Sequence, residues 1–204
     1  MRYCEQHSTP ADLVLYELER ETYLKTLAPQ MMSGKLQGQL LRFLSQMIRP
    51  QSILEIGTFT GYASICLAQG LSDKGILHTI EANPEYAYFG KKYFPKAGLT
   101  DQIIAHIGRA EKVIPKLPIQ FDLAFIDAGK NDYASHYDLV FDKIRAGGYI
   151  LADNVLWSGK VVQKEKDADT AVIRAFNEKV RQDDRVEKVM LPIRDGLFII
   201  RKKC

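Results

Sequence analysis

The segment from Ser52 to Gly61 constrains the fold of this chain most. An apolar run of strand type, Ser52–Gly57, ends in a turn that carries two glycines, and a helical segment follows from Tyr62 to Gln69. In α/β proteins, a strand that enters a glycine-rich turn and a helix start holds nucleotide-like ligands. The chain is therefore expected to be an α/β protein with a ligand site at this turn.

Strand and helix patterns alternate regularly after this first strand. Further strands are expected at 76–81, 103–108, 121–127, 149–153, 186–191 and 197–201, and helices at 62–69, 84–94, 110–114, 133–144 and 169–181. Gly147-Gly148 is expected to close the helix at 133–144. The alternation predicts a mostly parallel seven-stranded sheet with helices on both faces. Asp195-Gly196 in the short last connection predicts a hairpin, so the last strand should be antiparallel.

Two helical patterns precede the first strand. One begins near Pro10 and ends near Leu27, and the other begins after Gly34 and ends at Arg49-Pro50. We expect residues 1–50 to form an N-terminal helical cap and residues 51–204 to form the core of a single domain. A length of 204 residues is enough for one domain with a full hydrophobic core.

The composition is that of a globular protein with a mild net charge of +3. It permits a nucleic-acid partner but does not favour one, because no long basic run or basic-aromatic stripe is present. The sparse cysteines, Cys4, Cys66 and Cys204, fit a reducing compartment better than a disulfide framework. No apolar run approaches the ~20 residues that cross a bilayer. We therefore expect a cytoplasmic protein that does not bind membranes.

The spacing of the turn points away from a dinucleotide. A pyrophosphate needs the Gly-x-Gly-x-x-Gly turn, and Phe59 stands where the middle glycine is required. S-adenosylmethionine has no phosphate, and its carboxylate and ammonium groups suit a looser turn with an acid such as Glu55 nearby. Glu81, about 20 residues after the turn, is placed to hold a ribose hydroxyl pair. The competing interpretation is a tight strand-to-helix turn with no ligand.

Acidic residues also end two later strands. Asp127 follows one expected strand, and Asp153-Asn154 follows the next. Hard oxygen ligands without a nearby His or Cys suit Mg²⁺, or else Mn²⁺ or Ca²⁺, rather than zinc. The competing interpretation is ordinary turn chemistry, because Asp and Asn often begin turns and helices.

Several of these segments together resemble one known family. The matching motifs are Leu54-Glu55-Ile56-Gly57-Thr58-Phe59-Thr60-Gly61-Tyr62-Ala63-Ser64, Ile80-Glu81-Ala82-Asn83-Pro84, Phe121-Asp122-Leu123-Ala124-Phe125-Ile126-Asp127-Ala128-Gly129-Lys130, Leu151-Ala152-Asp153-Asn154-Val155-Leu156-Trp157-Ser158-Gly159 and Arg194-Asp195-Gly196-Leu197. The chain resembles the cation-dependent, S-adenosylmethionine-dependent O-methyltransferases of the catechol and caffeoyl-CoA type. The resemblance implies the Rossmann-like class I methyltransferase fold and a homodimer.

The resemblance also implies roles for individual residues. The cofactor would be bound by Glu55, Gly57, Thr58, Gly61, Tyr62, Ser64, Glu81, Ala110, Glu111 and Asp127, and the divalent cation by Asp127, Asp153 and Asn154. Lys130 and Asp127 would be catalytic, and Met32, Lys130 and Trp157 would contact the substrate. One position departs from the family: Gly129 stands where many caffeoyl-CoA relatives carry a second Asp.

The leading hypothesis is methyl transfer from S-adenosylmethionine to a hydroxyl of a catechol-like small molecule, an aromatic with two adjacent hydroxyls. Metal binding would stabilise the phenolate of such a substrate at neutral pH. Two alternatives remain open from the sequence. One is O-methylation of a hydroxylated tRNA base of the 5-hydroxyuridine type, and the other is a non-catalytic cofactor-binding module.

Overall fold

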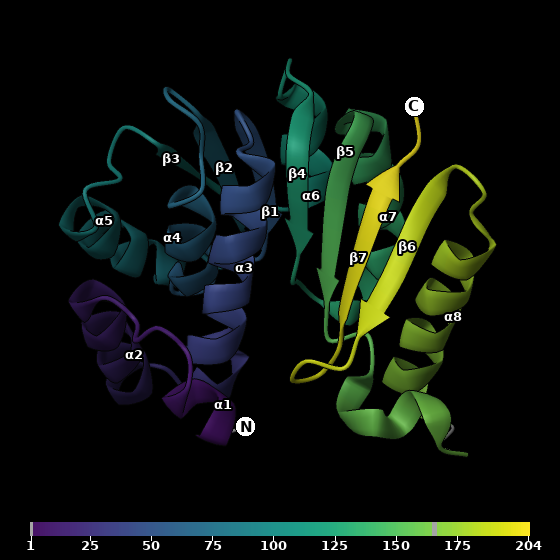
Figure 1. Ribbon diagram of the computed structural model, residues 1–204, viewed down its shortest axis with the longest axis horizontal. Helices are drawn as coiled ribbons and strands as arrows, with labels where there is room; N and C mark the ends of the chain where they lie inside the picture. Colours follow the sequence, from purple (N-terminus) through teal and green to yellow (C-terminus); the bar gives the residue numbers. More distant parts are fainter. Residues whose placement is uncertain (1, 165–166) are drawn as a thin grey trace. The chain divides into compact units, whose positions relative to one another are not determined.

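A seven-stranded sheet is the framework of the computed structural model, which describes residues 2–164 and 167–204 (Figure 1). The strands are β1 (Ser52–Ile56), β2 (Ile76–Glu81), β3 (Ile103–Ile107), β4 (Phe121–Ile126), β5 (Ile144–Asp153), β6 (Val186–Leu191) and β7 (Leu197–Lys202). Their order in the sheet is β3-β2-β1-β4-β5-β7-β6. The last strand, β7, is antiparallel to both β5 and β6, whereas β2–β3 and β4–β5 are parallel. The predicted mixed α/β fold is confirmed.

Helices surround the strands close to the expected positions. The α-helices are α1 (Arg2–Gln6), α2 (Leu13–Lys25), α3 (Gly34–Ile48), α4 (Tyr62–Ala68), α5 (Ala87–Lys96), α6 (Ala110–Val113), α7 (Tyr133–Lys143) and α8 (Ala168–Gln182). Short 3₁₀ turns are η1 (Pro29–Met31), η2 (Pro84–Tyr86), η3 (Ile114–Lys116), η4 (Lys130–Asp132) and η5 (Trp157–Val162). The sequence pattern did not predict α1, η1, η4 or η5. No helix among the residues described combines the length and apolar character that crossing a membrane requires.

The chain divides into two compact units, and the prediction of a single domain over residues 1–204 stays a prediction. The first unit contains the chain up to residue 53 together with residues 58–109. Within it, α4 packs on β2, α5 packs on β3, and α2 contacts both helices. Its interior includes the fully buried side chains of Leu18, Ile65 and Leu77.

The second unit contains residues 54–57 and 110–204. Strands β4, β5, β7 and β6 lie side by side in that order, and α7 packs on β4 and β5 while contacting α8 (Figure 1). The run Leu123–Ile126 in β4 is completely buried, as a parallel strand covered on both faces requires. This unit contains the strand ends on which the metal prediction depends.

The glycine pair after α7 has a different role from the one predicted. Helix α7 ends at Lys143, and β5 begins at once, because Ile144 already pairs with Phe121 of β4. The register then shifts before Leu123 pairs with Tyr149, so the residues between form an irregularity inside β5. Gly147 has φ +73°, a backbone conformation that side-chain-bearing residues rarely adopt. The pair therefore forms a bulge in the strand and does not close the helix.

Candidate active site

The carboxyl ends of β4 and β5 place three oxygen-bearing side chains at one edge of the sheet. Ile126 pairs with Ala152 in the parallel register, so the next residues, Asp127 and Asp153, follow at the same level. Asp127 is anchored by its N–H, which donates to the Ile56 carbonyl at 2.9 Å. Asn154 follows directly, and its N–H donates to Asp153 Oδ1 at 2.8 Å. Parallel pairing thus brings the three predicted metal ligands to the same end of adjacent strands.

The two carboxylates destabilise each other's charged forms. Burial raises the pKa of Asp127 well above its ordinary value, and the negative charge of Asp153 raises it further. The nearby Lys130 opposes this shift but does not cancel it. Asp153 is only 4% exposed. An added positive charge at this position would relieve the repulsion between the carboxylates.

Lys130 points into the same group of oxygens. Its Nζ donates to Asn154 Oδ1 at 2.6 Å and to the Tyr133 hydroxyl at 2.7 Å, and lies 3.6 Å from Asp127 Oδ1. Burial lowers the pKa of Lys130, although the charges of Asp127 and Asp153 act in the opposite direction. Lys130 is thus not the solvated surface lysine that its residue type favours. Its predicted position next to Asp127 agrees with the structure.

Tyr133 contacts Lys130 through both its hydroxyl and its ring. The Tyr133 hydroxyl accepts from Lys130 and donates to the Asp153 carbonyl at 3.0 Å. The ring is fully buried, and its centroid lies 4.5 Å from the lysine Nζ. Burial raises the pKa of Tyr133 far above its ordinary value, so the hydroxyl keeps its proton and remains a donor.

Trp157 follows the predicted ligand pair Asp153-Asn154 and lies near Lys130. Its ring centroid is 5.9 Å from Lys130 Nζ, within the range of a cation–π contact. The side chain is half-buried in η5. The structure therefore places two of the three predicted substrate residues, Trp157 and Lys130, beside each other.

Glu55, Gly57, Ala110 and Glu111 are the remaining predicted cofactor residues of the second unit. Glu55 is completely buried, and Ala110 is 5% exposed at the start of α6. Gly57 has φ +100°, and a Cβ on it would lie 1.8 Å from the Asp127 carbonyl oxygen. The fold itself therefore requires a glycine at position 57, whether or not a ligand binds there.

Glu111 is oriented by a histidine that the sequence pattern did not connect with it. His136 of α7 is buried, and its Nε2 donates to Glu111 Oε1 at 3.2 Å. Asp132 completes a cluster whose potential ligand atoms all lie within 4.8 Å of one another. A metal-bound imidazole normally donates its second N–H to a partner, and His136 Nδ1 has none among the residues described. We therefore assign His136 the role of orienting Glu111.

The predicted cofactor residues Thr58, Gly61 and Glu81 belong to the first unit. Glu81 is fixed at both carboxylate oxygens: Oε2 accepts from the Phe59 N–H and Oε1 from the Asn83 N–H, each at 2.8 Å. Thr58 Oγ1 contacts Thr79 Oγ1 at 2.5 Å. These bonds hold the turn after β1 against the end of β2, where Glu81 was predicted to meet a ribose.

The fold also explains why position 61 is a glycine. Its φ is +90°, and a Cβ there would lie 2.7 Å from the Phe94 ring. Tyr62, Ser64 and Met32 are all buried, at 3%, 0% and 5% exposure. The ring of Tyr62 packs against Gly38 of α3, where a Cβ would meet it at 2.7 Å. The predicted roles of these residues stay predictions.

Comparisons with known proteins identify the family. The O-methyltransferase family model matches residues 5–203. A probable caffeoyl-CoA O-methyltransferase of Dictyostelium discoideum is 32% identical over 209 residues, which cover 99% of this chain and 91% of the relative. A catechol O-methyltransferase of Niastella koreensis is 35% identical over 161 residues, covering 76% of this chain and 72% of the relative. This chain belongs to the O-methyltransferase family of the catechol and caffeoyl-CoA type.

Solved structures agree with this membership. The O-methyltransferase of Bacillus cereus, determined in complex with SAH, superposes with a TM-score of 0.91 at 29% identity, and the match covers 99% of this chain and 96% of that one. The chain is an S-adenosylmethionine-dependent O-methyltransferase with the class I methyltransferase fold. Membership of this enzyme family argues against the alternative, considered from the sequence, of a module that binds the cofactor without catalysis.

The site of this methyltransferase fits a hard divalent cation. Two carboxylates and one amide oxygen are the donor types that Mg²⁺, Mn²⁺ and Ca²⁺ prefer. The pKa of Asp127 is raised first by burial and then by the negative charge of Asp153. Lys130 Nζ, at 2.6 Å from Asn154 Oδ1, contacts the same oxygens. The donor set is thus chemically suited to a hard cation.

Position 129 of the methyltransferase has room for the aspartate that the family resemblance led us to expect there. Gly129 is exposed with φ −56°, and a Cβ built on it meets nothing within 4 Å. An aspartate could therefore occupy the position without strain or collision. Packing does not explain the glycine.

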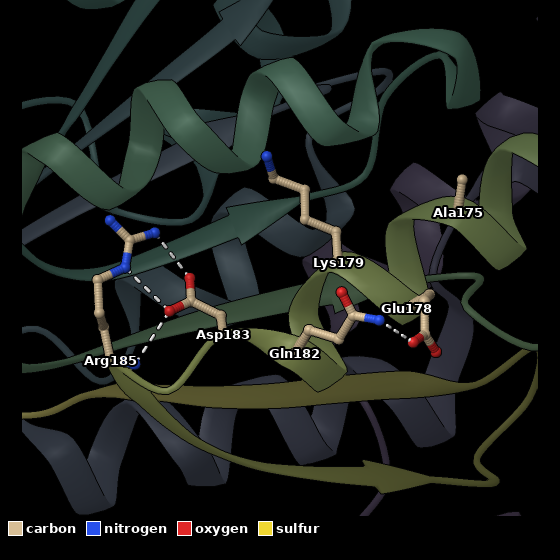
Figure 2. Close-up of a pocket in the computed structure, with 6 residues that line it drawn as sticks. All are labelled: Ala175, Glu178, Lys179, Gln182, Asp183 and Arg185. Carbon is tan, nitrogen blue, oxygen red and sulfur yellow. Dashed lines mark hydrogen bonds and ion pairs between the residues drawn. The ribbon is translucent and has the colours of Figure 1, made fainter.

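A surface depression elsewhere in the methyltransferase lacks the features of an active site. It has a volume of about 530 Å³ and is lined by Ala175, Glu178, Lys179, Gln182, Asp183 and Arg185 (Figure 2). Its charged groups are largely paired: Arg185 with Asp183 at 2.7 Å, and Lys179 with Asp138 of α7 at 2.9 Å. No predicted site residue is among those that line it.

Three residues that contact the site were not predicted from the sequence. Tyr133 binds Lys130, His136 orients Glu111, and Asp195 binds the segment that follows Asn154. Tyr133 carries a usable signal, because it follows Lys130 by three residues and lies within one helical turn of it. The contacts of His136 and Asp195 join residues that are far apart in the sequence, so no local pattern links either residue to its partner.

Proposed function

We propose that this enzyme transfers the methyl group of S-adenosylmethionine to a hydroxyl of a catechol-like small molecule with the help of a divalent cation, most simply Mg²⁺. The observation that carries the proposal is the convergence of Asp127, Asp153 and Asn154 beside Lys130 at the ends of β4 and β5. The named relatives support the substrate class, because two of them act on catechol or caffeoyl-CoA by their printed names.

The cofactor and cation would be divided among the residues described above. We propose that the cofactor is bound by Glu55, Gly57, Thr58, Gly61, Tyr62, Ser64, Glu81, Ala110, Glu111 and Asp127. The cation would be held by Asp127, Asp153 and Asn154, and when bound it would supply positive charge that favours the ionised form of a neighbouring hydroxyl. Met32 and Trp157 would contact the acceptor.

Lys130 would act as the general base that accepts the hydroxyl proton of the acceptor. A phenol has a pKa of about 10, so little phenolate exists at neutral pH without help. Burial lowers the pKa of Lys130, which favours the neutral amine that can accept the hydroxyl proton at Nζ. The phenolate oxygen then forms a bond to the methyl carbon while the carbon–sulfur bond breaks, and its electron pair stays on sulfur. The products are the methyl ether and S-adenosylhomocysteine, with the proton on Lys130.

Tyr133 and Trp157 would position these groups. The Tyr133 hydroxyl keeps its proton and donates to the Asp153 carbonyl, so its remaining lone pairs are aimed at Lys130 Nζ. The half-buried Trp157 ring would form a wall against the aromatic acceptor and reduce the access of water. These residues act by orientation, which is the main contribution available to an enzyme in a methyl transfer of this kind.

The proposal is tested by methyl transfer from labelled cofactor to a panel of catechols, with the protein stripped by EDTA and then supplied with Mg²⁺ or Mn²⁺. We expect turnover to need added metal, and Lys130→Met to lower kcat by about 10²- to 10⁴-fold while cofactor affinity changes little. Lys179→Met on α8 is the matched control. Full activity after metal removal would contradict the role of the cation. tRNA is assayed in parallel with the catechols, and methylation of tRNA but of no catechol would contradict the proposed acceptor.

We also propose a homodimer and a cytoplasmic location. The dimer is supported by exposed apolar side chains on α3, among them Phe43 at 51% and Met47 at 73% exposure. The location is supported by free cysteines, of which Cys4 and Cys204 are exposed.

A further inference from the structure

The segment that follows Asn154 has an unusual backbone. Asn154, Trp157 and Ser158 have φ values of 56°, 48° and 53°, and Gly159 has φ 77°. Glycine takes this left-handed conformation readily and asparagine tolerates it, but tryptophan and serine adopt it at a cost. Such a conformation persists only where surrounding contacts impose it. The contacts around Trp157 and Ser158 therefore decide where the indole ring lies.

The β6–β7 hairpin supplies the first set of contacts. The carbonyl oxygen of Asp195 accepts from the Leu156 N–H at 2.8 Å, and Asp195 Oδ1 accepts from the Ser158 N–H. Gly196 packs so closely that a Cβ on it would lie 2.5 Å from Leu156 Cγ. Asp195 thus binds the backbone on both sides of Trp157.

Helix α8 supplies a second set of contacts further along. Arg174 Nε donates to the Val161 carbonyl at 3.0 Å, and Nη2 donates to the Lys160 carbonyl at 2.8 Å. The same Nη2 also donates to the Gln163 carbonyl. One guanidinium therefore donates hydrogen bonds to three carbonyls of the residues that follow Gly159. These bonds fix the C-terminal end of the segment.

The segment held in this way carries two of the proposed functional groups. Asn154 Oδ1 is 2.6 Å from Lys130 Nζ, and the Trp157 ring centroid is 5.9 Å from the same nitrogen. A change in the backbone at Trp157 and Ser158 would move the indole relative to Lys130. The position of the acceptor wall therefore depends on contacts made by the backbone on either side of Trp157.

We infer that Asp195 and Arg174 are positioning residues, which hold residues 154–163 so that Trp157 faces Lys130 and forms the wall of the acceptor site. The inference rests on the proposed function for the role of that wall. Asp195 acts through the Ser158 N–H, and Arg174 acts through the carbonyls of Lys160 and Val161. Neither residue takes part in the methyl transfer.

The protein offers a direct probe of this arrangement, because Trp157 is its only tryptophan. In Asp195→Ala, the Ser158 N–H loses its acceptor, so we expect the Trp157 emission to shift to longer wavelength and acrylamide to quench it more strongly. Asp195→Asn keeps an oxygen acceptor and loses the charge, so it should stay close to wild type. Both variants lack the carboxylate charge, and the difference between them isolates the hydrogen bond.

Kinetics supply the second readout. Asp195→Ala should raise the acceptor KM by about 10-fold or more with a smaller loss in kcat, because the wall is displaced while Lys130 remains. Affinity for S-adenosylhomocysteine, measured by calorimetry, should stay within about two-fold of wild type. Asp195→Asn should recover most of the KM.

Two arginine variants on α8 test the contacts made by Arg174. They also provide the test if Asp195→Ala fails to fold. Arg174→Ala should increase quenching of Trp157, whereas Arg181→Ala should not, because Arg181 pairs with the exposed Glu178. Unchanged emission and quenching in Arg174→Ala, or equal changes in Asp195→Ala and Asp195→Asn, overturn the inference. Fluorescence needs no turnover, so a failure of the proposed substrate class leaves this result distinguishable.

Discussion

At the scale of single residues, the candidate site holds two like charges that the fold buries close together. Asp127 and Asp153 end neighbouring parallel strands, and their mutual repulsion adds to the cost of removing each carboxylate from water. Lys130 offsets part of that cost from 3.6 Å. The proposed cation would add positive charge beside these two carboxylates and lower their mutual repulsion.

The raised pKa of Asp127 has a defined consequence for stability. The native protein binds a proton at this carboxyl more tightly than the unfolded chain does. The contribution of Asp127 to the free energy of unfolding is therefore most favourable at low pH and is lost as the pH rises through its raised pKa. Replacing the carboxylate by a neutral amide should remove this dependence.

Asp127→Asn is expected to raise the free energy of unfolding of the metal-free protein by about 1 kcal/mol at slightly alkaline pH and by less in mild acid. The same change should weaken Mn²⁺ binding by at least about 100-fold. Urea unfolding and calorimetric titration measure the two effects. Asp138→Asn, on the exposed side of α7, is the control and should change neither. A less stable variant, or one that binds Mn²⁺ normally, would show that Asp127 is not a ligand under electrostatic strain.

At the scale of elements, one buried carboxylate joins two helices of the first unit. Glu21 of α2 accepts from Lys92 Nζ and the Tyr93 hydroxyl of α5 at 2.5 Å each, and from the Tyr88 hydroxyl at 2.9 Å. It also pairs with Lys25 at 2.8 Å. Burial raises the pKa of Glu21, but the hydrogen bonds from these four partners outweigh it and hold the pKa far below its ordinary value.

Glu21→Gln should lower the free energy of unfolding by about 2 kcal/mol at neutral pH, because charged hydrogen bonds to a largely buried group are lost. The stabilisation from Glu21 is present above the pKa of an unfolded glutamate and is lost as the pH falls below it. The variant and the wild type should therefore converge in acid. Urea unfolding at several pH values tests this. Glu17→Gln removes a more exposed ion pair with Lys96 and should lower the free energy of unfolding far less. An equal loss of stability in both variants would mean that the buried contacts of Glu21 add no extra stability.

At the scale of the whole molecule, the N-terminal helices present apolar surface that a monomer would leave in water. On α2, Leu13, Tyr16 and Leu24 are 71%, 53% and 74% exposed, and α3 adds Phe43 and Met47. On α3 the apolar positions recur every three or four residues, which is the pattern of a helix face that packs against a partner. Exposed apolar patches of this kind mark interaction surfaces.

We expect the wild-type enzyme to be a dimer and Phe43→Glu/Met47→Glu to be a monomer, as measured by light scattering after size exclusion. Two buried glutamates would have to lose their hydration at the interface, which disfavours association. Val189→Glu places one glutamate on an exposed apolar site of β6 and should leave the dimer intact. A dimer that survives the double substitution would place the interface elsewhere.

The strands and the helix faces of this enzyme were predictable because their signals are local. A buried parallel strand such as β4 needs a continuous apolar run, and Asp195-Gly196 specifies a hairpin within a few residues. The meeting of Asp127 with Asp153 was also predictable. Parallel strands end at the same edge of a sheet, so two acids that follow successive strands can be placed together from their positions alone.

The amino-acid sequence of this protein thus carries its fold class, its family and the residues that meet in the candidate site. It does not carry the bulge at Gly147, which arises because α7 runs directly into a strand whose register is set by β4. Nor does it show that Asp195 binds Ser158 or that His136 orients Glu111. Those contacts join residues from 25 to 37 positions apart. They exist only after long-range packing has placed one element against another, and no periodicity along the chain encodes them.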